Sequence, residues 1–396
     1  MAPKATETNK KRKPANLVLA EGRPYLEAPE NHITPRIFVA ATRQNEGKTT
    51  TCLGLYHVLS TIFPHVGYIK PIGQRFVEVA GLMIDEDSVL FDSVYDTDVP
   101  IEAMSPISID PTFTRRYLTD PQQRRYLVDR MCRAFDRTAY AKDAVIIEGS
   151  GHAGVGAICD LSNAQVARIL GSKAIIVSSG GIGRPVDEIA LNKSLFDKFG
   201  VEVAGAILNK VIPSKIDIVR EFAGMGLARM GIPLLAVIPE EKRLRAPNFG
   251  QVVEEIGGRW LHEEAQGKLQ RIERVIIGAM SAKDIIEHLQ PGILLLCPGD
   301  RDDAILAAIA SMASGRQSAA GIMLTNGIVP HPKIMDLVAK TSLPVAMCDP
   351  DSYKTASKIY SMTIKTQPQD TDKIPIIRDL VMDNIDMDLL KKSLTC

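Results

Sequence analysis

The 396-residue chain has no CxxC pair and no cluster of cysteines with the spacing of a metal site. Its six cysteines are scattered, and several lie inside apolar runs, where a thiol behaves as a small hydrophobic group. This pattern argues against a disulfide framework and indicates a reducing, cytoplasmic compartment.

The sequence also has no membrane-spanning segment and no excess of basic residues, which argues against membrane and nucleic-acid partners. No apolar run is long enough to span a bilayer, and no signal-peptide core follows the basic N-terminus. The 47 basic residues balance 47 acidic ones, which gives no support for non-specific binding to nucleic acid or to an anionic membrane. We expect neither partner. Residues 1–34 are expected to be a disordered tail and lead-in; a nucleic-acid role for Lys10–Lys13 is the minor alternative.

The first glycine of the phosphate-binding pattern GxxxxGK[ST] is also missing, because Thr42 stands there. The rest of the pattern is present. The apolar run Ile37–Ala41 predicts a buried strand, a polar loop follows, and Gly47-Lys48-Thr49-Thr50 opens an apolar-periodic stretch that predicts a helix. Backbone N–H groups and the dipole at such a helix start favour an anion.

In this interpretation Lys48 would reach the outer phosphates and Thr49 would offer its hydroxyl to Mg²⁺. The alternative is that a lysine and two threonines cap an ordinary helix. The strand and helix on either side favour a variant of the phosphate-binding loop (P-loop), whose polar residues could also position a second substrate.

Further polar side chains lie at the ends of predicted strands. Lys70 ends the strand 65–72 and is a candidate second anion contact, the alternative being a surface lysine. Asp85, Glu86 and Asp87 are either acids at a helix N-terminus or a source of a Mg²⁺ carboxylate. Glu148 ends the strand 144–148, where an acid can bind Mg²⁺ directly or through water.

Strands alternate with helices along most of the chain, which predicts an α/β protein with a doubly wound parallel sheet. Asn209 and Pro239 end two further strands. A second series of alternating strands and helices begins near Val275 and closes with a helix over 376–394. This series contains no Gly-Lys-Thr, so we do not expect it to duplicate the ATP site. The expected domains are a P-loop domain at 35–241, a linker at 242–271 that holds the single Trp260, and a smaller α/β domain at 272–396.

Six short segments resemble the dethiobiotin synthetases and their cobyrinate amide synthase relatives over about 35–241. They are AATRQNEGKTTT, IKPIG, IDEDSVLF, VIIEGSG, GAILNKV and AVIPEE, in that order. The resemblance implies ATP and Mg²⁺ as cofactors and catalytic roles for Lys48 and Lys70. It implies that Asn209 contacts adenine and that Thr49, Asp87 and Glu148 bind the metal. The full set expected around the nucleotide is Thr42, Asn45, Glu46, Gly47, Lys48, Thr49, Thr50, Asn209 and Pro239.

Residues 272–362 resemble the DRTGG domain, through Asp300-Arg301, LTNG at 324–327 and LPVAMCDPDSY at 343–353, with DKI at 372–374 just beyond. Asp302-Asp303 replace the rest of the named motif. The two domains in this order resemble the N-terminal half of long-form phosphate acetyltransferases. Their acyltransferase domain has no counterpart here, so acetyl transfer is not expected from this chain alone.

Two departures from the synthetase pattern affect the chemistry: Arg43 stands where an acidic residue is usual, and EGSGHAG replaces an EGAGG-type loop. Nucleotide binding is therefore favoured over dethiobiotin formation. Three hypotheses remain. The first is an ATP-dependent regulator or sensor, and the second is an ATP-dependent C–N ligase that phosphorylates a carboxylate or carbamate. The third is a subunit that regulates a separate acyltransferase by contact. The resemblance also suggests a homodimer.

Overall fold

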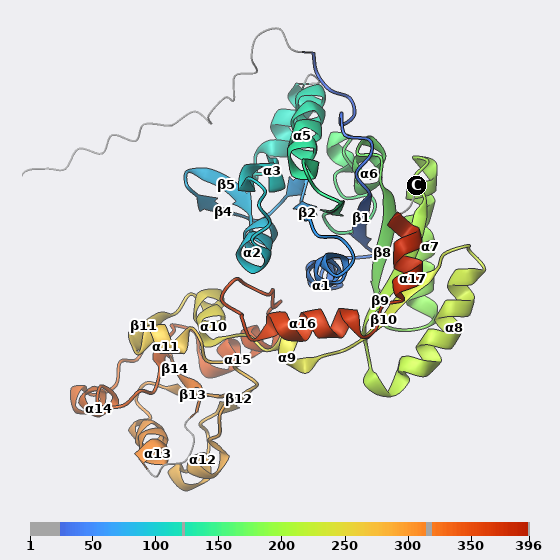
Figure 1. Cartoon of the computed structure of the whole chain (residues 1–396). Helices are drawn as coiled ribbons and strands as arrows, with labels where there is room; N and C mark the ends of the chain where they lie inside the picture. The colour runs from blue at the N-terminus through green and yellow to red at the C-terminus, as the bar shows by residue number, and fades with distance from the viewer. Residues whose placement is uncertain (1–23, 121–122, 314–318, 395–396) are drawn as a thin grey trace, which may run out of the picture.

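The computed structural model describes residues 24–120, 123–313 and 319–394, which form two α/β units (Figure 1). The first unit has a central sheet of six strands, all parallel. Their order across the sheet is β10 (Leu234–Pro239), β9 (Val203–Val211), β8 (Lys173–Ser179), β1 (Arg36–Ala41), β7 (Ala144–Glu148) and β2 (Val66–Ile69). This confirms the predicted doubly wound parallel sheet.

Helices cover both faces of this sheet. Alternate residues of the buried strand β1 point to opposite sides, so apolar side chains on each face are covered by helices. Phe38 and Ala40 face one core, and Ile37 and Val39 face the other. The first core is covered by α4 (Phe113–Thr119), α5 (Gln123–Ala139), α6 (Asn163–Ile169), α7 (Gly183–Lys198) and α8 (Ile216–Ala228). The second is covered by α1 (Lys48–Ser60), α2 (Glu86–Tyr95), α3 (Ile101–Met104), α16 (Lys373–Met382) and α17 (Met387–Leu394).

Smaller elements follow β2 at the rim of the first unit. Two short parallel strands, β3 (Ile72–Gly73) and β6 (Ile107–Ser108), pair with each other. The hairpin of β4 (Phe76–Val79) and β5 (Leu82–Asp85) leads directly into α2. This hairpin delivers Asp85 and Asp87 to the carboxyl edge of the large sheet.

The second unit is built on a five-stranded sheet in the order β11 (Arg259–His262), β15 (Val345–Met347), β14 (Gly321–Thr325), β13 (Ile293–Pro298) and β12 (Arg274–Ile277). Only β11 is antiparallel to its neighbour. The helices are α10 (Phe249–Ile256), α11 (Glu264–Gly267), α12 (Ala282–His288), α13 (Asp302–Ala313), α14 (Pro332–Val338) and α15 (Ser352–Ser361). A smaller α/β unit therefore follows the P-loop unit, as predicted.

The linker expected at 242–271 was wrong for most of its length. After the short α9 (Lys242–Arg245), α10 and β11 already belong to the second unit, and β11 pairs with β15. Trp260 packs edge-on against Phe249, with ring centroids 4.9 Å apart. Strand β11 was not predicted because it is a half-buried edge strand of only four residues within a mixed, charged sequence.

The expected C-terminal helix was also wrong in its length and in its place. Two helices, α16 and α17, are separated near Ile385, where the Asp386 N–H donates to the Leu235 carbonyl of β10 at 2.8 Å. Ile377, Val381 and Leu390 belong to the core that includes α1, in the first unit. Figure 1 shows α16 lying between the second unit and the parallel sheet.

Two smaller expectations also changed. The proline-containing segment 100–118, whose prolines at 100, 106 and 111 suggest irregular structure, contains α3 and most of α4. Of the expected tail, residues 1–23 lie outside the described residues, but the rest is held against α5. The Leu26 N–H donates to Asp129 Oδ1 and the Asn31 N–H donates to Asp136 Oδ1, each at 2.8 Å.

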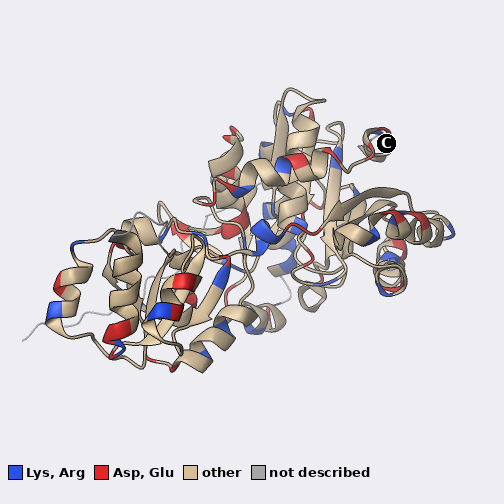
Figure 2. Ribbon diagram, turned by 90° about the horizontal axis from the view of Figure 1, so that it is seen from below, with Lys and Arg blue, Asp and Glu red and all other residues tan. Residues whose placement is uncertain are grey.

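Charged residues of both signs occur in each of the two units. Figure 2 shows Lys and Arg intermingled with Asp and Glu in both. In the described ranges, none of the helices combines the length and apolar character that crossing a bilayer requires.

Candidate nucleotide site

The P-loop connects the end of β1 to the start of α1, at the carboxyl edge of the sheet. Gly47 has a φ of 83°, and a Cβ added there would lie 2.2 Å from Asn209 Nδ2. Backbone conformation and lack of space therefore both require glycine. No described side chain caps α1. The first-turn N–H groups of a helix have no carbonyl partner within it, so this end is suited to an anion.

Glu148 joins the side chains predicted to bind phosphate and metal. Its Oε1 accepts hydrogen bonds from Lys48 Nζ at 2.9 Å and from Thr49 Oγ1 at 2.8 Å. Its Oε2 accepts one from the Tyr68 hydroxyl at 2.8 Å. The carboxylate is fully buried, so these donors replace its solvation. A lysine and threonine that only capped a helix would have no reason to converge on a buried acid.

Lys70 is almost fully buried among three carboxylates, not a surface lysine. Its Nζ pairs with Asp87 and lies 3.1 Å from Asp85 Oδ1 and 3.9 Å from Glu148 Oε1. Burial would lower the pKa of Lys70, but the carboxylates of Asp87, Glu148 and Asp85 raise it well above its usual value. The ammonium therefore stays charged at neutral pH.

The acidic cluster divides into two roles. Asp85 is the N-cap of α2, where its Oδ1 accepts the Asp87 N–H at 3.0 Å. Burial raises the pKa of Asp85. Burial also acts to raise the pKa of Asp87, but the charges of Lys70, Lys365 and Lys48 outweigh it and lower that pKa. Asp87 is thus an ionised carboxylate beside the P-loop. The alternative of an acid at a helix N-terminus is confirmed for Asp85. A role of Asp87 as a Mg²⁺ ligand stays a prediction.

Asn209 and Lys210 hold the P-loop from the end of β9. Asn209 Nδ2 donates to the Glu46 carbonyl at 2.9 Å, and its Oδ1 accepts the Lys210 N–H at 2.9 Å. Lys210 Nζ donates to the Asn45 carbonyl. Both polar atoms of the Asn209 side chain are therefore occupied within the protein, and its contact with adenine stays a prediction.

Thr42 is not among the residues that line the cavity beside the P-loop, and its place around the nucleotide stays a prediction. Its Oγ1 hydrogen-bonds to Ser178 Oγ at 2.9 Å, and its N–H donates to the Val177 carbonyl at 2.8 Å. Thr42 fixes the start of the loop to β8. The next residue, Arg43, pairs with Glu188 of α7 at 2.6 Å and does reach the cavity.

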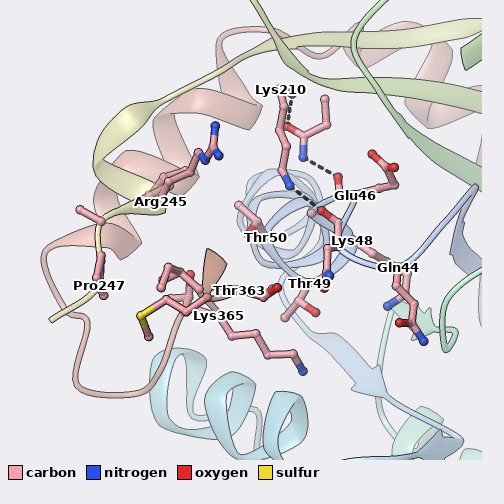
Figure 3. A pocket seen from close by; sticks show the side chains of 18 of the residues that line it. Gln44, Glu46, Lys48, Thr49, Thr50, Lys210, Arg245, Pro247, Thr363 and Lys365 are labelled. Atoms are coloured by element: carbon pink, nitrogen blue, oxygen red, sulfur yellow. Dashed lines mark hydrogen bonds between the residues drawn. The ribbon is translucent and has the colours of Figure 1, made fainter. Parts of the chain in front are cut away.

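A cavity of about 1100 Å³ lies between the two units (Figure 3). The P-loop contributes residues 43–50, including Asn45, Glu46 and Thr50. The connection at 239–247 contributes Pro239 and Arg245. The second unit contributes residues 359–366, and the Lys365 side chain among them extends below Thr49 in Figure 3.

Sequence reasoning missed several of these residues. Tyr68 precedes Lys70 by two positions in an extended segment, and that spacing places both side chains on one face. This signal was available for Tyr68. Nothing local to Lys210 or Lys365 indicates that either reaches the P-loop.

The site offers an incomplete set of oxygen ligands. Within the described part of the chain, no group of three or more His, Cys, Asp or Glu side chains forms a metal site by itself. Thr49, Asp87 and Glu148 supply one hydroxyl and two carboxylates close to the open end of α1. Such a set suits Mg²⁺, which is usually held by one or two carboxylates together with phosphate and water.

Sequence comparisons agree with the two-unit organisation. The family described as AAA domain (AAA_26) matches residues 35–248, more than half of the chain. The chain belongs to this AAA domain family. The DRTGG domain matches residues 251–362, which places its start ahead of the expected residue 272 and at α10.

Curated relatives of the chain include phosphate acetyltransferases. That of Pseudomonas aeruginosa is 27% identical over 372 residues, which cover 90% of this chain and 51% of the relative. That of Nitratidesulfovibrio vulgaris is 26% identical over 352 residues, 85% of this chain and 48% of the relative. The resemblance to the N-terminal half of these enzymes is confirmed, and the chain spans about half of their length.

Among solved structures, the septum site-determining protein MinD from Pyrococcus horikoshii, complexed with Mg-ADP, is 18% identical. The match covers 54% of this chain and 84% of that chain, with a TM-score of 0.34. A similarity of this size carries no functional inference.

Proposed function

We propose that this chain binds Mg-ATP in its first unit and transmits the nucleotide state to its DRTGG unit, as a cytoplasmic ATP-dependent regulator or sensor. One observation carries the proposal. Lys48 and Thr49, at the open N-terminus of α1, both reach the buried Glu148, with Lys70 and Asp87 beside them.

Each side chain has a role that follows from its position. Lys48 would exchange Glu148 for the outer phosphates, and the first-turn N–H groups of α1 would receive the same anion. Thr49, Asp87 and Glu148 would hold Mg²⁺, which when bound would offset phosphate charge. The other residues around the nucleotide would be Thr42, Asn45, Glu46, Gly47, Thr50, Asn209 and Pro239.

Transmission to the second unit is supported by two physical connections. Residues 359–366 of the second unit line the same cavity as the P-loop. The chain then continues into α16, which packs on α1 through the core that contains Ile377 and Val381. Because the relatives are phosphate acetyltransferases, an acyltransferase is the protein partner we would seek first, and a homodimer is the assembly we expect.

A second candidate is an ATP-dependent ligase, and the size of the cavity favours it. Ligand pockets usually measure about 300–1,000 Å³. A cavity of about 1100 Å³ leaves room for a second substrate beside a nucleotide. In a ligase, the Lys70 ammonium would stabilise the oxygens of the phosphoryl group in transfer.

The test uses the full chain with labelled ATP and Mg²⁺ in a filter-retention assay, followed by identification of the retained nucleotide. Lys48→Ala is the site variant, and Lys215→Ala, at an exposed position outside the cavity, is the matched control. Intact ATP retained by the wild type and the control, but not by Lys48→Ala, supports the sensor. Rapid release as ADP favours the ligase. Equal retention by Lys48→Ala would overturn the assignment of the P-loop.

A further inference from the structure

Lys365 of the second unit reaches the carboxylates of the first. Its Nζ lies 3.6 Å from Asp87 Oδ1 and 3.7 Å from Glu86 Oε2. The Lys365 side chain is 34% exposed, and that of Asp87 is 5% exposed. The lysine therefore approaches a mostly buried acid from the cavity side, and Figure 3 shows it extending below Thr49.

The segment that carries Lys365 is fixed to the second unit. The Lys365 carbonyl accepts a hydrogen bond from Gln251 Nε2 of α10 at 3.1 Å. Five residues later the fully buried Asp370 accepts from Arg271 Nη2 at 2.9 Å and from the Gln367 N–H at 3.0 Å. A movement of the second unit would therefore move Lys365 with it.

Charge balance shows what Lys365 does in the absence of ligand. Three carboxylates, those of Asp85, Asp87 and Glu148, surround Lys70, and Lys48 adds a second ammonium. Lys365 is the third cation at this cluster. A divalent ion held by Asp87 would remove the attraction that places Lys365 there. The phosphates of a nucleotide would then be the nearest anion for its ammonium.

We propose that Lys365 is a phosphate-binding residue that the second unit supplies to the nucleotide site of the first. On this view the ammonium transfers from Asp87 and Glu86 to the outer phosphates when Mg-ATP binds, which holds residues 363–366 against the P-loop. The inference rests on the proposed function and adds to it the contact through which the DRTGG unit detects nucleotide.

The first measurement is the equilibrium affinity of the full chain for Mg-ATP. Loss of one charged contact with phosphate corresponds to a decrease of about tenfold or more, and we expect this for Lys365→Ala. Lys365→Arg should retain most of the affinity. Lys358→Ala is the matched control, because Lys358 pairs with Glu255 and does not line the cavity.

The second measurement separates phosphate binding from a general loss of structure. Backbone amides of residues 363–366 should exchange hydrogen more slowly when Mg-ATP is added to the wild type and to Lys365→Arg. In Lys365→Ala this protection should be absent, while amides of the core strand β1 should exchange as in the wild type.

Four outcomes are decisive. Weaker binding and lost protection in Lys365→Ala alone support the proposal. Wild-type affinity in Lys365→Ala, with Lys48→Ala impaired, overturns this inference and leaves the proposed function intact. Tighter binding by Lys365→Ala also overturns it, because the lysine would then compete with the ligand. Wild-type affinity in Lys48→Ala overturns both.

Discussion

Val381 of α16 packs so closely on Gly54 of α1 that a Cβ built on Gly54 would lie 2.2 Å from Val381 Cγ2 and 2.4 Å from its Cβ. The helix that begins at the P-loop and the helix that follows the second unit are thus in direct backbone-to-side-chain contact. Because packed interiors contain few voids, neither helix can shift without the other. This contact links the second unit to the P-loop by a route separate from the cavity.

We predict that Gly54→Ala destabilises the full chain. Alanine gains up to about 1 kcal/mol over glycine within a helix. Overpacking a close contact costs about 1–3 kcal/mol, which outweighs that gain. The free energy of unfolding should therefore fall, as measured in urea. Gly224→Ala in α8 is the control, because its Cβ would meet only Leu234 Cδ2, at an ordinary 3.6 Å.

The double variant Gly54→Ala/Val381→Gly tests whether Val381 is the cause. A glycine at this position also removes the Val381 Cβ, which would lie 2.4 Å from the new methyl group. The double variant should therefore be more stable than the sum of the two single changes predicts. Strict additivity would show that the loss arises elsewhere in α1.

The contact between α1 and α16 could not be predicted from the sequence, whereas several other features of the site could. The order of the P-loop strand, Lys48 and Glu148 could be predicted because each has a local signal: an apolar run, a motif or the tip of a strand. The apolar residues of 376–394 predict helix, but periodicity does not say which surface will bury them. No local sequence signal marks Lys365. It is a single lysine in a polar loop, and only the folded structure shows that it lies beside Asp87.

Lys70→Met should destabilise the protein in the absence of Mg²⁺. It leaves Asp85, Asp87 and Glu148 without their shared buried cation. Removing one partner of a buried ion pair typically costs about 3–5 kcal/mol. Urea unfolding would measure the loss. Adding Asp87→Asn to Lys70→Met removes one of the uncompensated charges and should recover part of it. A Lys70→Met protein as stable as the wild type would mean that the cluster is neutral without Lys70.

Asn209→Ala should weaken the binding of both Mg-ATP and Mg-GTP. The variant removes the hydrogen bond from Asn209 Nδ2 to the Glu46 carbonyl, which holds the P-loop in the same way for either base. One lost hydrogen bond of about 1 kcal/mol corresponds to an affinity decrease of about fivefold. Competition titrations with both nucleotides would measure it. An additional loss that is selective for ATP would support the predicted contact of Asn209 with adenine. Unchanged affinity for both nucleotides would contradict the role of Asn209 in holding the P-loop.

Lys373 is fully buried at the start of α16, next to the segment that carries Lys365. Its Nζ donates to the Leu244 carbonyl at 3.1 Å and lies 3.8 Å from Asp370 Oδ2. Burial lowers the pKa of Lys373 to about 8, despite the opposing charges of Asp370 and Asp372. Arg271 acts in the same direction as burial.

The sign of the pH effect follows from where the proton is bound. Between about pH 8 and 10.5 the unfolded chain keeps the proton on Lys373, while the folded protein has lost it. Stability therefore rises with pH across this window through Lys373 alone, by a total on the order of 3 kcal/mol. The measurement is the difference in unfolding free energy between wild type and Lys373→Met, because other titrating groups cancel in that difference. The unfolding free energy of the wild type should increase relative to that of the variant as the pH rises from 8 to 10.5. A constant difference would show that Lys373 has an ordinary pKa, and a shrinking one that its charged form is the favoured one in the fold.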